Sequence, residues 1–162
     1  MTPRWYALDD AQHARIPAAL QSWLAETGSL TQRLKRHCAG AFDLVVLSEA
    51  DAPLPVDDAA TLGLEPGVPV RVREVHMRCD GVPRIHARSL LPHATLAGAG
   101  RDLASLGERP LGDALFAHPD MLRGPIEVTD TPGWGRRSVF SLSGQPVLVT
   151  EWFLPALFEC EG

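Results

Sequence analysis

Glu151 is the single charged residue in a stretch of sequence that otherwise has the apolar pattern of a buried β-strand. Residues 145–154 alternate as a strand does, and Glu151 follows Val147 and Val149 on one predicted face. The other face of this strand is no more polar. Because burial of an unpaired charge costs several kcal/mol or more, Glu151 needs a protein cation or a ligand group beside it.

A second stretch of sequence repeats the same layout. Residues 73–92 and 136–155 both follow the pattern R-x7-G-x-P-x7-L-P. The dipeptides Asp80-Gly81 and Ser143-Gly144 in the middle suit the tight primed turns of hairpins. The sequence therefore predicts two β-hairpins that place similar residues at similar positions.

The turns predict which charged residues face each other across each hairpin. With two-residue turns, Arg136 lies opposite Glu151, and Arg73 lies opposite Arg88. The first pair attracts, whereas the second repels by roughly 0.2–1 kcal/mol unless an anion lies between the two arginines. A partly dry Arg and Glu can hold an acidic ligand and handle its proton. The structural alternative is that Arg136 and Glu151 form only a cross-strand ion pair worth about 1 kcal/mol or less.

The remaining sequence predicts the elements that position these hairpins. A helix is expected from Pro17 to about Glu26, and a capping box at Ser29 to Gln32 predicts a second helix. Further expected elements are a strand at 42–48, short helical turns at 58–62 and 102–106, a helix beginning at Pro110 and a strand at 126–129. We expect one α+β domain over residues 1–162, with five or six antiparallel strands and helices packed on one face of the sheet.

Composition narrows the class of protein. The 162 residues are 45% hydrophobic, which suits one substantial core. A net charge of −5 and no run of basic residues argue against nucleic acid as a partner. No apolar run approaches the roughly 18 residues of a membrane span, and the N-terminus lacks a signal core. We therefore expect a cytoplasmic protein without a membrane span. Separately from composition, we expect a monomer.

The sequence shows no pattern typical of a metal or cofactor site. Cys38, Cys79 and Cys160 are odd in number and form no C-x-x-C motif, so reduced thiols are expected. The six histidines lack metal-ligand spacing. Lys35, the single lysine, lies on a predicted solvated helix face, which disfavours Schiff-base chemistry. We expect neither metal nor cofactor.

A set of segments resembles bacterial chorismate lyase, and their order and spacing match from about Ile16 to Pro155. The two most specific segments contain Arg136 and Glu151. The matching segments are Ser29-Leu30-Thr31-Gln32-Arg33, Arg73-Glu74, Cys79-Asp80-Gly81-Val82-Pro83, Pro110-Leu111-Gly112 with Leu115-Phe116, Trp134-Gly135-Arg136-Arg137-Ser138, Leu142-Ser143-Gly144 and Thr150-Glu151-Trp152-Phe153-Leu154-Pro155.

The resemblance implies a small cytoplasmic α+β enzyme without cofactor or metal. Such an enzyme converts chorismate to 4-hydroxybenzoate and pyruvate, the first committed step toward ubiquinone. The resemblance further implies that Arg73 binds the ring carboxylate, that Glu151 meets the oxygen at the para position, and that Leu30 and Leu111 line a closed pocket. Met is common at the position of Leu30, but the Met and Leu side chains have similar volumes, so we expect the pocket wall to be preserved. Arg73 and Glu151 are thus the expected catalytic residues, and we add Arg88 as charge support near the entry or the second carboxylate.

Two alternatives from other classes stay open at this point. One is a non-catalytic domain that senses a small aromatic acid, because effector domains of some bacterial transcription regulators share the chorismate lyase fold. The other is an interaction module that uses its sheet to bind a partner, which would show an exposed apolar patch and no closed pocket.

Overall fold

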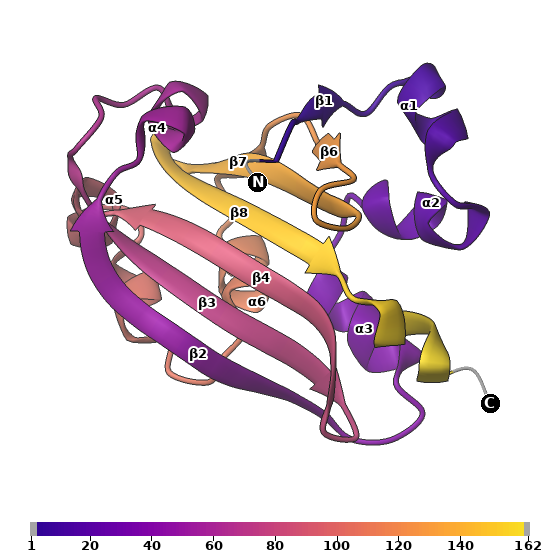
Figure 1. Cartoon of the computed structure of the whole chain (residues 1–162). Helices are drawn as coiled ribbons and strands as arrows, with labels where there is room; N and C mark the ends of the chain where they lie inside the picture. The colour runs from indigo at the N-terminus through magenta and orange to yellow at the C-terminus, as the bar shows by residue number, and fades with distance from the viewer. Residues whose placement is uncertain (1–2, 161–162) are drawn as a thin grey trace.

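The protein folds around one antiparallel sheet. The computed structural model describes residues 3–160, apart from the side chains of residues 10–12 and 159–160. The strands lie in the order β1-β6-β7-β8-β4-β3-β2, and β5 also pairs with β7 (Figure 1). Their bounds are β1 Tyr6–Ala7, β2 Phe42–Pro53, β3 Pro69–Cys79, β4 Val82–Pro92, β5 Met121–Arg123, β6 Glu127–Thr129, β7 Gly135–Leu142 and β8 Gln145–Phe153.

Helices cover both faces of this sheet unequally. In Figure 1, α3 and α6 lie behind the sheet, whereas α4 lies in front of it at one end. The helical elements are α1 Asp10–Arg15, α2 Ala18–Leu24, α3 Leu30–His37, α4 Val56–Leu62, α5 His93–Ala97, η1 Arg101–Ser105, α6 Leu111–Ala117 and η2 Pro155–Cys160. Within the described residues, no helix is long and apolar enough to cross a membrane.

The expected α+β class with an antiparallel sheet is confirmed, but the sheet is larger than predicted. Over the described residues it has eight strands rather than five or six. Strands β1 and β5 contain two and three residues, which is too short for an alternating pattern to appear in the sequence. The predicted cap of α3 is confirmed, because the Ser29 hydroxyl accepts a hydrogen bond from the backbone N–H of Gln32 at 3.1 Å.

Both hairpins have the predicted turns, but only one has the predicted register. Asp80-Gly81 and Ser143-Gly144 all have positive φ, as a primed turn requires. Across β7 and β8 the pairing is regular, and Arg136 lies opposite Glu151 as expected.

The register across β3 and β4 corrects the sequence-based pairing. Cys79 and Arg78 pair with Val82 and Pro83 as expected, but the register shifts by one residue between Arg78 and Met77. Arg73 consequently lies opposite Ser89, so the predicted pairing of Arg73 with Arg88 is wrong. Neighbouring residues of a strand point to opposite faces, and the shift therefore sends the Arg88 side chain to the sheet face opposite Arg73.

The extra residue that causes the shift is Arg84, which is buried. Its guanidinium donates to the carbonyl of Cys79 at 3.3 Å and to the carbonyl of Ala156 in η2. The bulged residue thus contacts a backbone acceptor from the far end of the chain, which no local pattern in the hairpin reveals.

Three groups of buried apolar residues form the core. Two lie on the face covered by α2, α3 and α6, and the third lies beneath α4 on the opposite face, around Leu62, Leu90 and Leu148. Neither face of β8 is therefore fully solvated, which explains why its sequence lacks a polar side.

The structure also corrects the expectation of reduced thiols. A disulfide joins Cys38, at the end of α3, to Cys79, at the end of β3, with a Cα to Cα distance of 5.5 Å. That distance suits a disulfide, but the 41-residue separation carries no motif that could have predicted it. The side chain of Cys160 lies outside the described part of the chain.

Candidate active site

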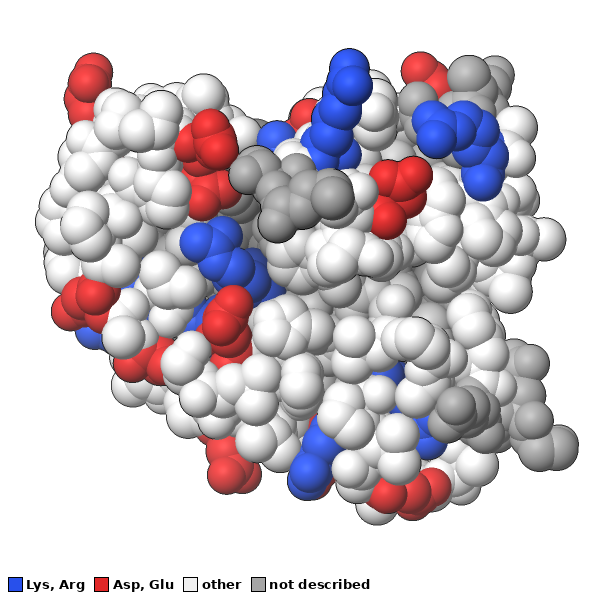
Figure 2. Space-filling model, in the orientation of Figure 1, with Lys and Arg blue, Asp and Glu red and all other residues white. Residues whose placement is uncertain are grey.

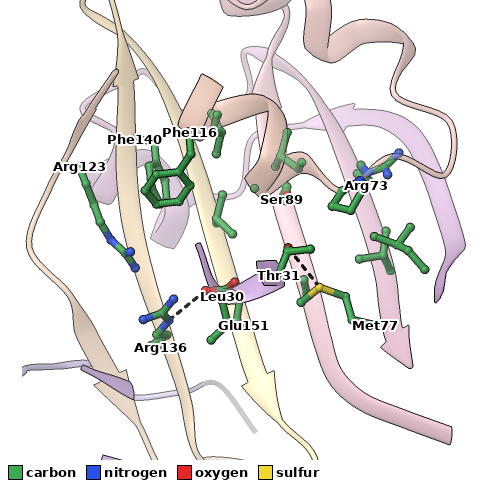
Figure 3. Close-up of a pocket in the computed structure, with 18 of the residues that line it drawn as sticks. Leu30, Thr31, Arg73, Met77, Ser89, Phe116, Arg123, Arg136, Phe140 and Glu151 are labelled. Atoms are coloured by element: carbon green, nitrogen blue, oxygen red, sulfur yellow. Dashed lines mark hydrogen bonds and ion pairs between the residues drawn. The ribbon is translucent and has the colours of Figure 1, made fainter. Parts of the chain in front are cut away.

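A cavity lies between the two core groups on the helix-covered face of the sheet (Figure 3). Its walls are mainly apolar, and its floor is formed by β3, β4, β7 and β8. Helices α3 and α6 cover it, and a hydrogen bond of 3.0 Å from the Gln32 amide to the Asp113 carboxylate joins them. Its ionic residues are Arg73, Arg123, Arg136 and Glu151.

Glu151 and Arg136 occupy one end of the cavity. The Glu151 carboxylate accepts a hydrogen bond from Nε of Arg136 at 3.0 Å, and its side chain is 14% exposed. Arg136 is fully buried, and its Nη1 also donates to the carbonyls of Trp23, Leu24 and Glu26 at 2.6 to 3.4 Å. Carbonyls at a helix end carry partial negative charge, so they stabilise this guanidinium and fix its direction. Glu151 is therefore a carboxylate held in place by a rigid cation.

Arg73 lies on the opposite side of the cavity, on β3 (Figure 3). Its side chain is buried, with 2% exposure, and Nη1 pairs with the carboxylate of Glu49 on β2 at 2.8 Å. Nη2 donates to the carbonyl of Arg109 at 3.0 Å. Two of the five N–H groups are thus engaged by these partners, and a carboxylate in the cavity would share the guanidinium with Glu49.

Arg123 on β5 is a third arginine of the cavity, and it is partly buried. Its Nε donates to the Ser138 hydroxyl at 3.2 Å, and its Nη1 lies 3.3 Å from the carbonyl of Glu26. Burial, followed by the nearby charge of Arg136, lowers the pKa of Arg123 to about 10. The side chain is still charged at neutral pH.

Smaller polar groups lie between the two ends. Thr31 on α3 is buried, and its hydroxyl lies 3.6 Å from the sulfur of Met77. Ser89 on β4 is also buried and lines the cavity beside Arg73. These hydroxyl groups are the polar features of an otherwise apolar middle section.

The structure brings four of the five predicted site residues together. Leu30, Arg73, Leu111 and Glu151 all line the cavity. Arg88 does not, because the register shift turns it to the other face, where it lies 3.5 Å from Asp58 of α4. Figure 2 views this other face, on which acidic and basic side chains are interspersed.

The sequence alone did not indicate four residues at or beside the cavity, namely Arg123, Ser89, Thr31 and Glu49. Arg123 lies on a three-residue strand that no pattern indicated, and Ser89 enters the cavity only because of the bulge. Glu49 follows the stretch predicted as a strand, which β2 extends to Pro53. In the part of the chain that the structure describes, no group of three or more His, Cys, Asp or Glu is arranged to hold a metal ion.

Comparison with known proteins establishes the family. The family model described as "Chorismate lyase" matches residues 3–162. The chain belongs to the chorismate lyase family. A "Probable chorismate pyruvate-lyase" from Methylococcus capsulatus is 42% identical over 156 residues, covering 85% of this chain and 96% of the relative. Proteins of the same name from Thiobacillus denitrificans and Pseudomonas aeruginosa are 41% and 38% identical, covering 88% and 98% of this chain and 86% and 94% of those relatives.

Solved structures show that this fold extends beyond chorismate lyases. The effector domain of PhnF from Mycobacterium smegmatis superposes with a TM-score of 0.54 at 14% identity, covering 80% of this chain and 90% of that one. A GntR-family regulator from Bacillus cereus gives a TM-score of 0.53 at 15% identity, covering 75% and 96%. At these identities the likeness concerns the fold alone.

Proposed function

We propose that this chain is a chorismate lyase that converts chorismate to 4-hydroxybenzoate and pyruvate, the first committed step toward ubiquinone. The observation that carries the proposal is the cavity itself, with a carboxylate held by a buried arginine at one end and a second buried arginine at the other. This arrangement suits a ring that bears a carboxylate and, para to it, a hydroxyl group.

The reaction needs few groups from the protein. The ether bond between the ring and the enolpyruvyl oxygen breaks, and that oxygen leaves with the bonding electrons. The hydrogen on the neighbouring hydroxyl-bearing carbon is lost as a proton, which makes the ring aromatic, and the released enolpyruvate takes up a proton to become pyruvate. Because aromatisation favours the product strongly, the protein mainly orients the ring and excludes water.

Arg73 and Glu151 take separate roles in this proposal. Arg73 binds the ring carboxylate through its N–H groups that Glu49 and the Arg109 carbonyl leave unengaged. Glu151 lies at the hydroxyl end, where it accepts the ring proton or orients the hydroxyl. Arg136 positions the carboxylate, because its contacts to three carbonyls leave it little freedom.

The walls of the cavity supply the dry environment. Leu30, the first residue of α3, and Leu111, the first residue of α6, are both buried and come from the two helices that cover the cavity. Contact with these side chains would hold the apolar ring edge and keep water away from the reacting carbon.

A single assay tests this function. Purified protein is incubated with chorismate, and 4-hydroxybenzoate and pyruvate are both quantified. We expect equal amounts of the two products, and undiminished turnover in excess chelator. Loss of turnover on chelation with recovery on adding zinc or magnesium would overturn the cofactor-free mechanism. Binding of 4-hydroxybenzoate without any turnover would instead favour the alternative, a sensor of small aromatic acids.

A further inference from the structure

The charges at the Glu151 end of the cavity do not balance. Arg73 has the carboxylate of Glu49 at 2.8 Å, and Arg136 has that of Glu151 at 3.0 Å. Among the described residues, no carboxylate lies within salt-bridge distance of Arg123, the third arginine of the cavity. The nearby carboxylate of Glu26 is already paired with Arg33 at 3.7 Å. The group Arg123, Arg136 and Glu151 therefore carries one excess positive charge.

The direction of the Arg123 side chain is well determined. Nε donates to Ser138, Nη1 faces the carbonyls of Glu26 and Thr27, and the guanidinium carbon lies 5.0 Å from the centre of the Phe140 ring. Nη2 makes no hydrogen bond to any described residue. Figure 3 shows the guanidinium directed toward Arg136 and Glu151. An oriented donor thus remains available at the wall of the cavity.

The electrostatic state of Arg123 supports a missing anion. Burial and the charge of Arg136 lower its pKa to about 10, and the carboxylates of Glu151 and Glu26 oppose this shift only in part. The charged form is therefore still destabilised by its surroundings. A negatively charged group beside it would reverse that shift.

We propose that Arg123 binds the second carboxylate of the substrate, the one on the enolpyruvyl ether. This inference rests on the proposed function. Chorismate carries its ether on the ring carbon next to the hydroxyl-bearing carbon, so a ring held between Arg73 and Glu151 places the enolpyruvyl group near Glu151. On the β4 side Glu151 faces Ala87, which offers no charge. On the β7 side Glu151 faces Arg136, which is already paired with it. Beyond β7, the cavity offers Arg123 of β5.

The consequence is discrimination between substrate and product. Pyruvate leaves with the second carboxylate, and 4-hydroxybenzoate retains only the ring carboxylate that Arg73 would bind. Arg123 is therefore a residue specific for the dicarboxylate, whereas Arg73 serves both molecules.

Calorimetry with two matched probes tests this assignment. The first probe is 3-(carboxymethoxy)-4-hydroxybenzoate, which places a second carboxylate on an ether next to the hydroxyl group. The second is 3-ethoxy-4-hydroxybenzoate, which has the ether but no second carboxylate. We expect Arg123→Gln to lower affinity for the first probe about 10- to 100-fold, the scale of one charge-assisted hydrogen bond, and to leave the second probe and 4-hydroxybenzoate within about twofold.

Two further variants separate binding from structural support. Arg123→Lys keeps a positive charge and should recover part of the lost affinity for the dicarboxylate. Arg137→Gln removes the neighbouring arginine of β7, which lies on the other sheet face and pairs with Glu127 at 2.9 Å, and should bind both probes as the unaltered protein does. With chorismate, Arg123→Gln should raise KM by a similar 10- to 100-fold, more than it lowers kcat.

The outcomes distinguish this inference from the proposed function. Three results would each overturn the role of Arg123. Arg123→Gln could lose affinity equally for both probes or for neither probe, or the unaltered protein could show no preference for the dicarboxylate. If Arg123→Gln does not fold, Arg123→Lys takes its place, and an equal loss of affinity for both probes in Arg123→Lys overturns the role as well. A protein that shows the Arg123-dependent preference but forms no 4-hydroxybenzoate would keep a dicarboxylate-binding role for Arg123 and lose the lyase assignment.

Discussion

The two long hairpins of the sheet share a sequence pattern but not a register. β7–β8 is regular from its turn to its ends, so Arg136 and Glu151 meet directly inside the cavity. β3–β4 has one extra residue, so Arg88, which was expected opposite Arg73, lies on the other face of the sheet and outside the cavity. Arg73 is instead paired from the neighbouring strand, by Glu49 of β2.

This difference separates two ways of placing a charged group in an apolar site. The regular hairpin contains both partners, so the carboxylate of Glu151 arrives with its own fixed cation. The bulged hairpin supplies a cation whose partner lies on another strand and is itself partly exposed, at 26%. We infer that β7–β8 contributes chemistry and that β3–β4 contributes binding, and three sets of variants test that division.

Removal of the Glu151 charge should have the largest effect. Glu151→Gln keeps the shape and a hydrogen bond but cannot accept a proton. If the carboxylate accepts the ring proton, turnover should fall by about 10²- to 10⁴-fold while affinity for 4-hydroxybenzoate changes little. Steady-state kinetics with chorismate, together with calorimetry on the product, measures both.

Glu127→Gln is a matched control for this variant, because Glu127 pairs with Arg137 at 2.9 Å across β6 and β7 on the opposite face. It should leave turnover near normal. If Glu151→Gln also kept near-normal turnover, and Glu151→Gln and Arg136→Ala lowered Tm by similar amounts, Glu151 would be only a structural ion-pair partner.

Removal of Arg73 should weaken binding rather than chemistry alone. Arg73→Ala should lower affinity for 4-hydroxybenzoate by about 10- to 150-fold, because a charge-assisted pair with the ring carboxylate contributes roughly 1.5–3 kcal/mol. Arg73→Lys should rescue poorly, since an ammonium group cannot form two parallel hydrogen bonds. Calorimetry on the product measures the effect.

Arg71→Ala is the control for Arg73, because Arg71 lies on the same strand within 3.8 Å of Glu49 but outside the cavity. The affinity for 4-hydroxybenzoate should be unchanged in Arg71→Ala. Unchanged affinity in Arg73→Ala would remove Arg73 from the site and, with it, the binding role of the bulged hairpin.

The smallest effect is expected for Arg88, the residue that the bulge turns away. Arg88→Ala removes a partly exposed ion pair with Asp58, and such pairs contribute about 0–1 kcal/mol to stability. KM for chorismate should stay within about twofold. A tenfold rise in KM with unchanged Tm would mean that Arg88 does reach the substrate, and the division between the hairpins would need revision.

The sequence by itself determined the features that depend on a few neighbouring residues. Two-residue turns and strand alternation were sufficient to pair Arg136 with Glu151, and the Ser29 cap located the start of α3. Resemblance to chorismate lyases identified the segments that contain Leu30, Arg73, Leu111 and Glu151, which meet in one cavity.

Only the tertiary structure decided the features that depend on distant partners. The bulge at Arg84 forms where its guanidinium reaches the carbonyl of Ala156 in η2, and Cys38 and Cys79 bond across 41 residues. Arg123 enters the cavity through a strand of three residues that exists because β7 pairs with it. Periodicity and turn chemistry act over about ten residues or fewer, whereas these contacts form only after the sheet has brought remote segments together.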